Sequence, residues 1–143
     1  MNKNRHLIRE ERDIIELGLN KKESFKSIGR ELGKDPTTIA KEVRNHIQFR
    51  RTGCFGKAFN NCLIRRGCDR RNLCGDRKCS RFCSNCPNHP CSLLCPDYHP
   101  QMCSRLAKPP YVCNSCENKR SCTLEKRIYS AVHAQREYEA VRS

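Results

Sequence analysis

Apolar residues recur with the period of an α-helix between residues 5 and 47, a stretch that contains no cysteine. Ile8, Ile15 and Leu19 are spaced at i, i+7 and i+11, so they share one face of a helix. We expect this first helix over residues 8–19, because a glycine and a polar run close the pattern there.

Two more helices are predicted directly after the first, with a tight turn between them. Ser24 is placed to cap the second helix, and Gly33 ends it because glycine adopts the left-handed conformation without a Cβ penalty. Asp35 and Pro36 signal a third helix over residues 36–46, since a proline at the first helical position needs no N–H. So short a connection predicts a helix-turn-helix.

The rest of the chain divides into three predicted segments that follow a helix-turn-helix domain at residues 1–50. Residues 51–61 are rich in glycine and asparagine, which is typical of a linker. Helical periodicity disappears in residues 62–122, where Gly, Pro, Asn and Asp interrupt the sequence every few positions. It returns in residues 123–143, where Thr123 is placed to cap a last helix. That helix could pack on the preceding module, on another chain or on a missing domain.

Composition shows that packing alone cannot hold this chain together. Of the 143 residues, 36% are hydrophobic, but that fraction includes 13 cysteines and no tryptophan. A short and polar chain does not fill one large core, and small domains with this deficit usually rely on disulfides or metal ions. The deficit also disfavours a single catalytic α/β domain.

The cysteines are best interpreted as metal ligands. No apolar run resembles a signal peptide or a membrane span, so we expect a cytoplasmic, nucleoid-associated protein without membrane contact. Disulfides rarely persist in a reducing cytosol, and an odd cysteine count fits a closed disulfide framework poorly.

Twelve of the 13 cysteines can form about three zinc sites of four thiolates each, which leaves Cys54 over. Two C-x-x-C pairs have the spacing with which one tight turn offers two thiolates to one ion. The preferred grouping takes sequential quartets, which are Cys62, Cys68, Cys74 and Cys79; Cys83, Cys86, Cys91 and Cys95; and Cys103, Cys113, Cys116 and Cys122.

Other arrangements of the metal sites stay open. The quartets could interleave, and His89 or His99 could replace a cysteine. An iron–sulfur cluster is the main rival to zinc, whereas redox activity is disfavoured because no thioredoxin-like βαβ pattern is present. The expected architecture is a small all-α three-helix helix-turn-helix domain, then an irregular cysteine-rich module stapled by zinc, and a C-terminal helix.

The net charge of +14 at pH 7 indicates a polyanionic partner, which is most often nucleic acid. In a helix-turn-helix the second helix of the motif enters the major groove of double-stranded DNA. Base edges would meet Lys34, Thr37, Thr38, Lys41 and Arg44. Phosphates would meet Lys26, Arg30, Arg50 and Arg51. A solvated basic face on a three-helix scaffold is the plainer alternative.

A second basic cluster lies in the first half of the cysteine-rich module. It comprises Arg65, Arg66, Arg70, Arg71, Arg77, Lys78 and Arg81. Because phosphate contacts require only positive charge, this cluster predicts a further contact with the DNA backbone.

Residues 5–46, RHLIREERDIIELGLNKKESFKSIGRELGKDPTTIAKEVRNH, resemble the N-terminal domain of insertion-sequence-thirty transposases. The matching positions are Ser24, Ile28, Gly29, Leu32, Gly33, Thr37, Thr38, Ile39, Lys41 and Glu42. Ile8 stands where the family usually has Thr, which removes a helix cap. Lys41 stands where Arg is common, which replaces a bidentate contact by a point charge. The cysteine-rich stretch resembles an insertion carried by one branch of the family.

The resemblance implies a region that recognises the terminal inverted repeats of a mobile element. Transposases of this family cut and join DNA with three carboxylates that hold two metal ions on a ribonuclease-H-like sheet. The five aspartates here have no run of buried strands to hold them, so we expect no catalytic site and no small-molecule substrate. The chain is then a non-catalytic fragment, or the product of a truncated frame, of such a transposase.

A stand-alone transcriptional regulator is the alternative function, followed by protein-only assembly through the cysteine module and, last, an enzyme. A homodimer would suit inverted-repeat sites, and the sequence leaves the oligomeric state open.

Overall fold

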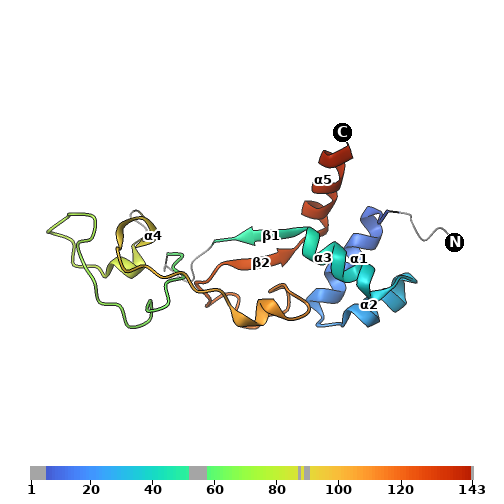
Figure 1. Ribbon diagram of the computed structural model, residues 1–143, viewed down its shortest axis with the longest axis horizontal. Coiled ribbons are helices and arrows are strands. Elements are labelled where there is room, and N and C mark those ends of the chain that lie inside the picture. Colours follow the sequence, from blue (N-terminus) through green and yellow to red (C-terminus); the bar gives the residue numbers. More distant parts are fainter. Residues whose placement is uncertain (1–5, 52–57, 87, 89–90, 143) are drawn as a thin grey trace. The chain divides into compact units, whose positions relative to one another are not determined.

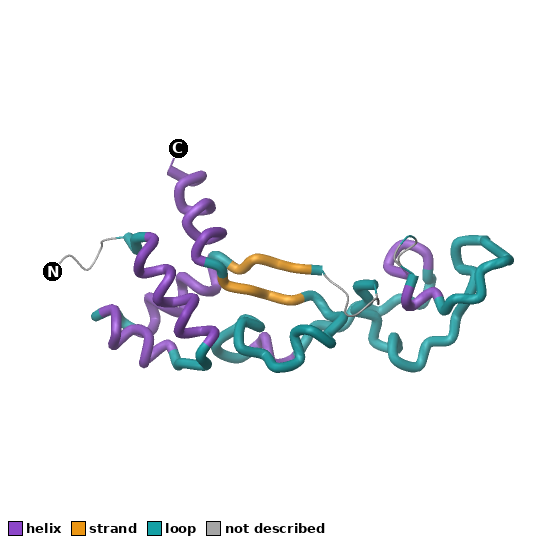
Figure 2. The backbone as a smooth tube through the Cα atoms, turned by 180° about the vertical axis from the view of Figure 1, so that it is seen from behind, coloured by secondary structure: helices purple, strands orange, loops and turns teal. Residues whose placement is uncertain are grey.

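The computed structural model describes residues 6–51, 58–86, 88 and 91–142 (Figures 1 and 2). The chain forms two compact units, and each is assembled from segments that are distant in the sequence. Unit 1 comprises Met1–Phe49, Arg105–Cys116 and Arg127–Ser143. Unit 2 comprises Arg50–Ser104 and Glu117–Lys126. The domains expected from the sequence are continuous ranges, whereas the chain crosses from one unit to the other more than once.

Three helices open unit 1 and form the predicted helix-turn-helix region: α1 (Arg9–Asn20), α2 (Phe25–Leu32) and α3 (Pro36–Asn45). Their inward faces meet in one hydrophobic core. The core side chains of these helices that are buried are Ile15, Leu19, Ile28, Ile39 and Val43. Their spacing along each helix is the spacing that predicted the helices.

Local sequence sets the ends of these helices. The Ser24 hydroxyl accepts a hydrogen bond from the Ser27 N–H at 3.1 Å and caps α2. Gly33 ends α2 with φ of 67°, in the left-handed region that favours glycine. At the start of α1, Ile8 offers no side-chain cap, but the Glu11 carboxylate accepts the Ile8 N–H at 3.0 Å. Half of a capping box is therefore kept.

A two-stranded sheet that the sequence did not predict joins β1 (Ile47–Arg50) to β2 (Lys126–Tyr129), and the two arrows run in opposite directions (Figure 1). The expectation of a helix from residue 123 onward is therefore wrong in its first part. Tyr129 is fully buried in the core of unit 1, and strand pairing with β1 outweighs the helical pattern.

The last helix, α5 (Ala131–Arg142), packs against α1 within unit 1. Ala134 lies in the hydrophobic core, and the Ala131 N–H donates to the Glu16 carboxylate at 2.7 Å. The sequence left three partners open for this helix, and the structure shows a fourth, which is the helix-turn-helix region itself.

Unit 2 is irregular, as expected. Its described residues include a 3₁₀ turn at Cys83–Asn85, the single-turn helix α4 (Cys91–Leu94) and an isolated bridge between Cys62 and Pro100. Part of the predicted linker is packed into this unit, because Asn60 is buried and its N–H donates to the Thr123 carbonyl at 3.2 Å. Within the described ranges, every member of the hydrophobic core cluster belongs to unit 1.

No helix among the residues that the structure describes is long and apolar enough to cross a membrane.

Candidate nucleic-acid interface and cysteine module

The third helix presents a polar stripe to solvent. Thr37, Lys41 and Arg44 are exposed and spaced at i, i+4 and i+7, so they lie on one face of α3. Thr38 is exposed beside them, and the opposite face buries Ile39, Glu42 and Val43. Hydroxyl, ammonium and guanidinium groups in this order can meet base edges in a major groove.

The Thr37 hydroxyl is engaged by the cap of α3. It donates to the Asp35 carboxylate at 2.6 Å, and the Thr37 N–H donates to the same oxygen at 2.8 Å. These two bonds hold the pKa of Asp35 below its ordinary value of 3.8. The proton of the hydroxyl is thus committed, and its oxygen lone pairs are left to accept from amino groups of adenine or cytosine.

Lys34 differs from the other candidate base-reading residues because it is mostly buried and paired with a carboxylate. Its side chain is 16% exposed, and its ammonium lies 3.7 Å from the Glu11 carboxylate of α1. Contact between Lys34 and DNA would have to compete with this ion pair. Sequence reasoning missed the pair because residue 11 precedes the motif by a full helix.

The candidate phosphate-binding residues fall in both units. Lys26 and Arg30 are exposed on α2 at i and i+4, within unit 1. Arg50 and Arg51 are exposed in unit 2. Arg51 donates to the Glu125 carboxylate at 2.9 Å, which partly neutralises its charge.

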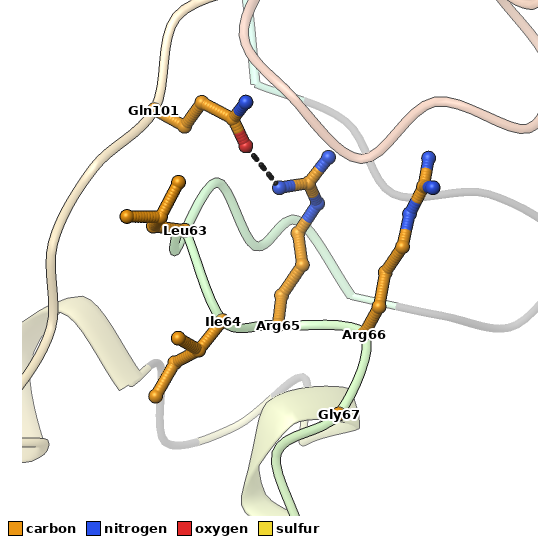
Figure 3. A pocket seen from close by; sticks show the side chains of 6 residues that line it. All are labelled: Leu63, Ile64, Arg65, Arg66, Gly67 and Gln101. Carbon is orange, nitrogen blue, oxygen red and sulfur yellow. Dashed lines mark hydrogen bonds between the residues drawn. The ribbon is translucent and has the colours of Figure 1, made fainter.

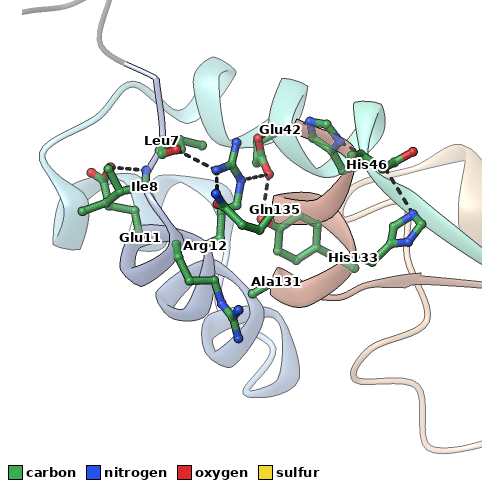
Figure 4. Close-up of polar contacts among 12 residues, drawn as sticks. Leu7, Ile8, Glu11, Arg12, Glu42, His46, Ala131, His133 and Gln135 are labelled. Atoms are coloured by element: carbon green, nitrogen blue, oxygen red, sulfur yellow. Dashed lines mark hydrogen bonds and ion pairs between the residues drawn. The ribbon is translucent and has the colours of Figure 1, made fainter. Parts of the chain in front are cut away.

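A buried polar network fixes α3 against the rest of unit 1 (Figure 4). The Glu42 carboxylate accepts from Arg12 Nε at 3.0 Å and from the Tyr129 hydroxyl at 2.8 Å. Arg12 also donates to the Leu7 carbonyl at 2.6 Å and to the Gln135 side chain at 2.7 Å. Burial first, and then the Glu42 charge, raise the pKa of Tyr129.

A sequence signal for this network exists in retrospect. Arg12 lies four residues after Ile8 and three before Ile15, on the apolar face of α1. Glu42 lies three residues after Ile39, on the buried face of α3. Charged residues at core positions are almost never fully buried unless they are paired.

A second polar contact links the end of α3 to α5. Glu137 on α5 faces two imidazoles, because its carboxylate lies 3.1 Å from His46 Nδ1 and 3.2 Å from His133 Nε2. The other nitrogen of His46 lies 3.7 Å from Glu42. Helix α3 is therefore braced at its C-terminal end as well as along its buried face.

The predicted zinc ligands are not gathered into metal sites among the residues that the structure describes. Within these ranges, no group of three or more Cys, His, Asp or Glu side chains is positioned to hold a metal ion, and no two of the twelve described cysteines form a disulfide. Cys54 and His89 lie outside the described residues. His99 is exposed, and its carbonyl accepts from the Leu63 N–H at 2.7 Å.

The surroundings of several sulfurs nevertheless suit thiolates. Backbone N–H groups of Leu73 and Leu124 each lie 3.4 Å from a sulfur, that of Cys83 and that of Cys122 respectively. Arg70 donates to the Cys95 sulfur at 3.5 Å. Donors aimed at sulfur stabilise the deprotonated form, which is the form that binds zinc.

Within unit 2, Cys91 lies near cysteines of two predicted quartets. Cys91 donates to the Cys83 carbonyl at 3.1 Å. Burial first, and then nearby Cys83, Cys95, Cys68 and Cys62, together raise the pKa of Cys91 to about 11. Cys62 and Cys68 come from the first sequential quartet, and the other three come from the second. The two nearest in effect, Cys83 and Cys95, share the second quartet with Cys91.

The third quartet is distributed over the two units. Cys113 and Cys116 belong to unit 1, where their C-x-x-C turn is closed by the Cys116 N–H, which donates to the Cys113 carbonyl at 2.9 Å. Cys103 and Cys122 belong to unit 2.

The basic cluster of unit 2 contains two structural arginines. Arg65 is half-buried and donates to Thr123 at 3.1 Å, to the Cys62 carbonyl at 3.1 Å and to Gln101 at 2.7 Å. Arg70 forms an ion pair with Asp97. The members of the cluster that are exposed to solvent are Arg66, Arg71, Arg77, Lys78 and Arg81.

An open cavity of about 300 Å³ lies beside Arg65 (Figure 3). Leu63, Ile64, Arg66 and Gln101 line it together with Gly67. Its walls combine exposed apolar side chains with cationic ones, and this combination does not indicate one class of ligand.

Residues 3–46 match the family model of a helix-turn-helix domain, a domain found in transposases. No curated protein and no solved structure matches the chain. The matched segment is the one that folds as α1, α2 and α3. The chain therefore carries a helix-turn-helix domain of a kind found in transposases, and such a domain indicates DNA binding.

Proposed function

We propose that this chain is the DNA-binding region of a transposase and that it recognises the terminal inverted repeats of a mobile element. The observation that carries the proposal is the exposed stripe of Thr37, Lys41 and Arg44 on α3, in a domain whose family occurs in transposases. In this arrangement the second helix of the motif reads bases, while basic residues beside it bind phosphates.

Specificity would come from α3. Thr37 would accept from a base amino group through its free lone pairs, and Lys41 would donate to guanine acceptors. Each such contact discriminates between base pairs by about 1–3 kcal/mol. Phosphate contacts from Lys26 and Arg30 would add affinity on any sequence and make binding dependent on salt.

Zinc ions, about three in number, would hold the cysteine-rich part of the chain. Two observations support this: the described core cluster lies in unit 1, and N–H donors approach the sulfurs of Cys83 and Cys122. A module without an apolar core needs another source of stability, and metal binding can supply the folding free energy directly.

The grouping of ligands can be tested by counting ions in serine variants. If the quartets are sequential, Cys68→Ser and Cys74→Ser should lose the same ion. If they interleave, Cys68→Ser and Cys91→Ser should lose the same ion, and the double variant should lose no more than either alone. Metal analysis of purified protein, with the absorption spectrum to exclude an iron–sulfur cluster, gives the count.

The aspartates support a non-catalytic role for this chain. Asp13 pairs with Arg9 at 3.0 Å, Asp35 caps α3, Asp76 accepts from the Lys78 N–H at 3.0 Å, and Asp97 pairs with Arg70. Each of these four carboxylates has a partner of its own, whereas a two-metal site needs several carboxylates gathered around the ions. Pure protein should not nick DNA in magnesium, and reproducible nicking would overturn this part of the proposal.

The function itself is tested by selecting sheared DNA of the host with zinc-loaded protein. Enrichment of the repeats that flank the gene, lost in Thr37→Ala and Lys41→Ala, is the expected result. Enrichment of unrelated operators would favour a transcriptional regulator. No enrichment would remove DNA recognition from the proposal.

A further inference from the structure

One aromatic side chain from outside the helix-turn-helix motif lies against its recognition helix. Tyr111 belongs to the segment Arg105–Cys116 of unit 1. Its ring stacks on Phe25 of α2, with ring centroids 6.1 Å apart and an interplanar angle of 27°. The Arg44 guanidinium of α3 lies over the same ring, 5.0 Å from its centroid.

Tyr111 is held firmly in this place. Its N–H donates to the Lys108 carbonyl at 2.9 Å, and the next residue, Val112, is buried in the core of unit 1. Asn114 then exchanges two hydrogen bonds of 2.9 Å with the backbone of Tyr129.

The backbone of Tyr111 is also unusual. It has φ of 65°, a left-handed conformation that a bulky residue rarely adopts. Such a strained conformation persists only where neighbouring contacts hold it in place, and it often marks a functional position. Here the contacts on both sides of Tyr111 hold the backbone in this conformation.

We infer that Tyr111 is a positioning residue, whose ring holds the Arg44 guanidinium on the exposed stripe of α3 for contact with a DNA phosphate. The phosphate replaces the base edge expected from the sequence, because Arg44 lies in the last turn of α3 and the N-terminal residues of such a helix are the ones that read bases. The inference rests on the proposed DNA binding. An exposed arginine loses rotamer freedom when it binds, so ordering it beforehand strengthens binding without adding a contact to DNA. Arginine suits this arrangement because its planar guanidinium stacks on a ring and still presents donors at its edge.

A double-mutant cycle on duplex DNA of mixed sequence tests the inference. Tyr111→Leu should lower the affinity about two- to five-fold, which is the range of an exposed cation–π contact. Arg44→Ala should lower it as well and reduce the slope of log K against log salt by about 0.9. Tyr111→Leu should have no further effect in the Arg44→Ala background, and Tyr111→Phe should bind like the wild type.

A matched control separates positioning from loss of stability. Tyr138 on α5 also lies under arginines, with its ring centroid 4.8 Å from Arg12 and 5.4 Å from Arg142, and neither arginine belongs to the exposed stripe of α3. Tyr138→Leu should lower the Tm while the folded protein keeps its affinity and salt slope. Additive effects of Tyr111→Leu and Arg44→Ala would overturn the inference, as would full affinity in Tyr111→Leu.

One measurement needs no substitution at Tyr111. In the free protein, the Nε–Hε group of Arg44 should have a higher NMR order parameter than that of Arg30, which is exposed on α2. Equal values would overturn the inference while the proposed function stands. A wild-type chain that binds no duplex would overturn both, so the two failures are distinguishable.

Discussion

Arg12 and Glu42 form an ion pair of 3.0 Å in which the two side chains are 3% and 7% exposed, and this pair ties α1 to α3, the helix proposed to read DNA. Its partners on both sides lie far along the chain, since Tyr129 donates to Glu42 and Gln135 accepts from Arg12. The orientation of α3 therefore depends on residues outside the helix-turn-helix motif.

Replacing one member of this pair should destabilise the protein strongly. Glu42→Leu leaves Arg12 buried without its carboxylate and should lower the free energy of unfolding by about 3–5 kcal/mol. Urea denaturation followed by circular dichroism measures the loss. The exposed pair of Arg9 and Asp13 is the matched control, because Arg9→Ala should change stability by about 0–1 kcal/mol. Equal effects at the two pairs would contradict the network.

Tyr129 should make stability depend on alkaline pH. Burial and Glu42 raise its pKa above the ordinary value of 10.0, so the folded state favours the neutral phenol. The contribution is fully present below pH 10.0 and is lost as the pH rises toward the raised value. Tyr129→Phe should therefore be less stable than the wild type at neutral pH by about 1.5–3 kcal/mol, because a hydrogen bond to a charge is lost.

The measurement is the difference in Tm between the two proteins from neutral pH to beyond pH 10.0. The difference should shrink as the pH rises. A constant difference would mean that Tyr129 does not titrate with a raised pKa.

Removing metal should affect the two units unequally. Within unit 2, the Cys83 N–H donates to the Arg70 carbonyl at 2.8 Å, and this amide should lose its protection from hydrogen exchange when a chelator is added. Amides of α1, whose inward residues Ile15 and Leu19 lie in the apolar core, should keep theirs. Exchange followed by mass spectrometry before and after zinc is restored gives the comparison. Unchanged protection in unit 2 would argue against structural zinc there.

The basic cluster of unit 2 should separate into DNA-binding and structural residues. Replacing Arg66, Arg77 and Lys78 by Glu should weaken binding to any duplex and lower the salt slope by about 0.9 for each phosphate that the variant no longer neutralises. Arg65→Gln should instead lower the Tm, because the side chain gives up its bonds to Thr123 and Gln101. A triple variant with unchanged affinity would show that this cluster does not touch DNA.

Local signals made the three helices of the helix-turn-helix region predictable from the sequence. Ser24, Gly33 and Asp35 each act on neighbouring residues, and the ends of α2 and the start of α3 follow directly from them. The β1–β2 pair was not predictable, because its strands are separated by the whole cysteine-rich stretch. The helical periodicity of residues 123–143 predicted a helix there instead, and the burial of Tyr129 decided the outcome.

The candidate site also has one part that the sequence predicted and one part that it did not. Exposure of Thr37, Lys41 and Arg44 follows from helical spacing, so the sequence predicted their face. The partners of that face, such as Glu11 with Lys34 and Tyr111 with Arg44, come from other segments and needed the structure. The grouping of the cysteines likewise depends on segments that are distant in the sequence, and cysteine spacing leaves it open.

The core around α1 also sets the order of events during synthesis. Tyr129 and Ala134 complete that core, yet the ribosome makes them only after it has translated the entire cysteine-rich stretch. At a translation rate of about 5–20 residues per second, several seconds pass before the final neighbours of Ile15 and Ile28 are made. A nascent chain in that interval exposes the apolar faces of its first three helices, and these faces would be binding sites for a holding chaperone.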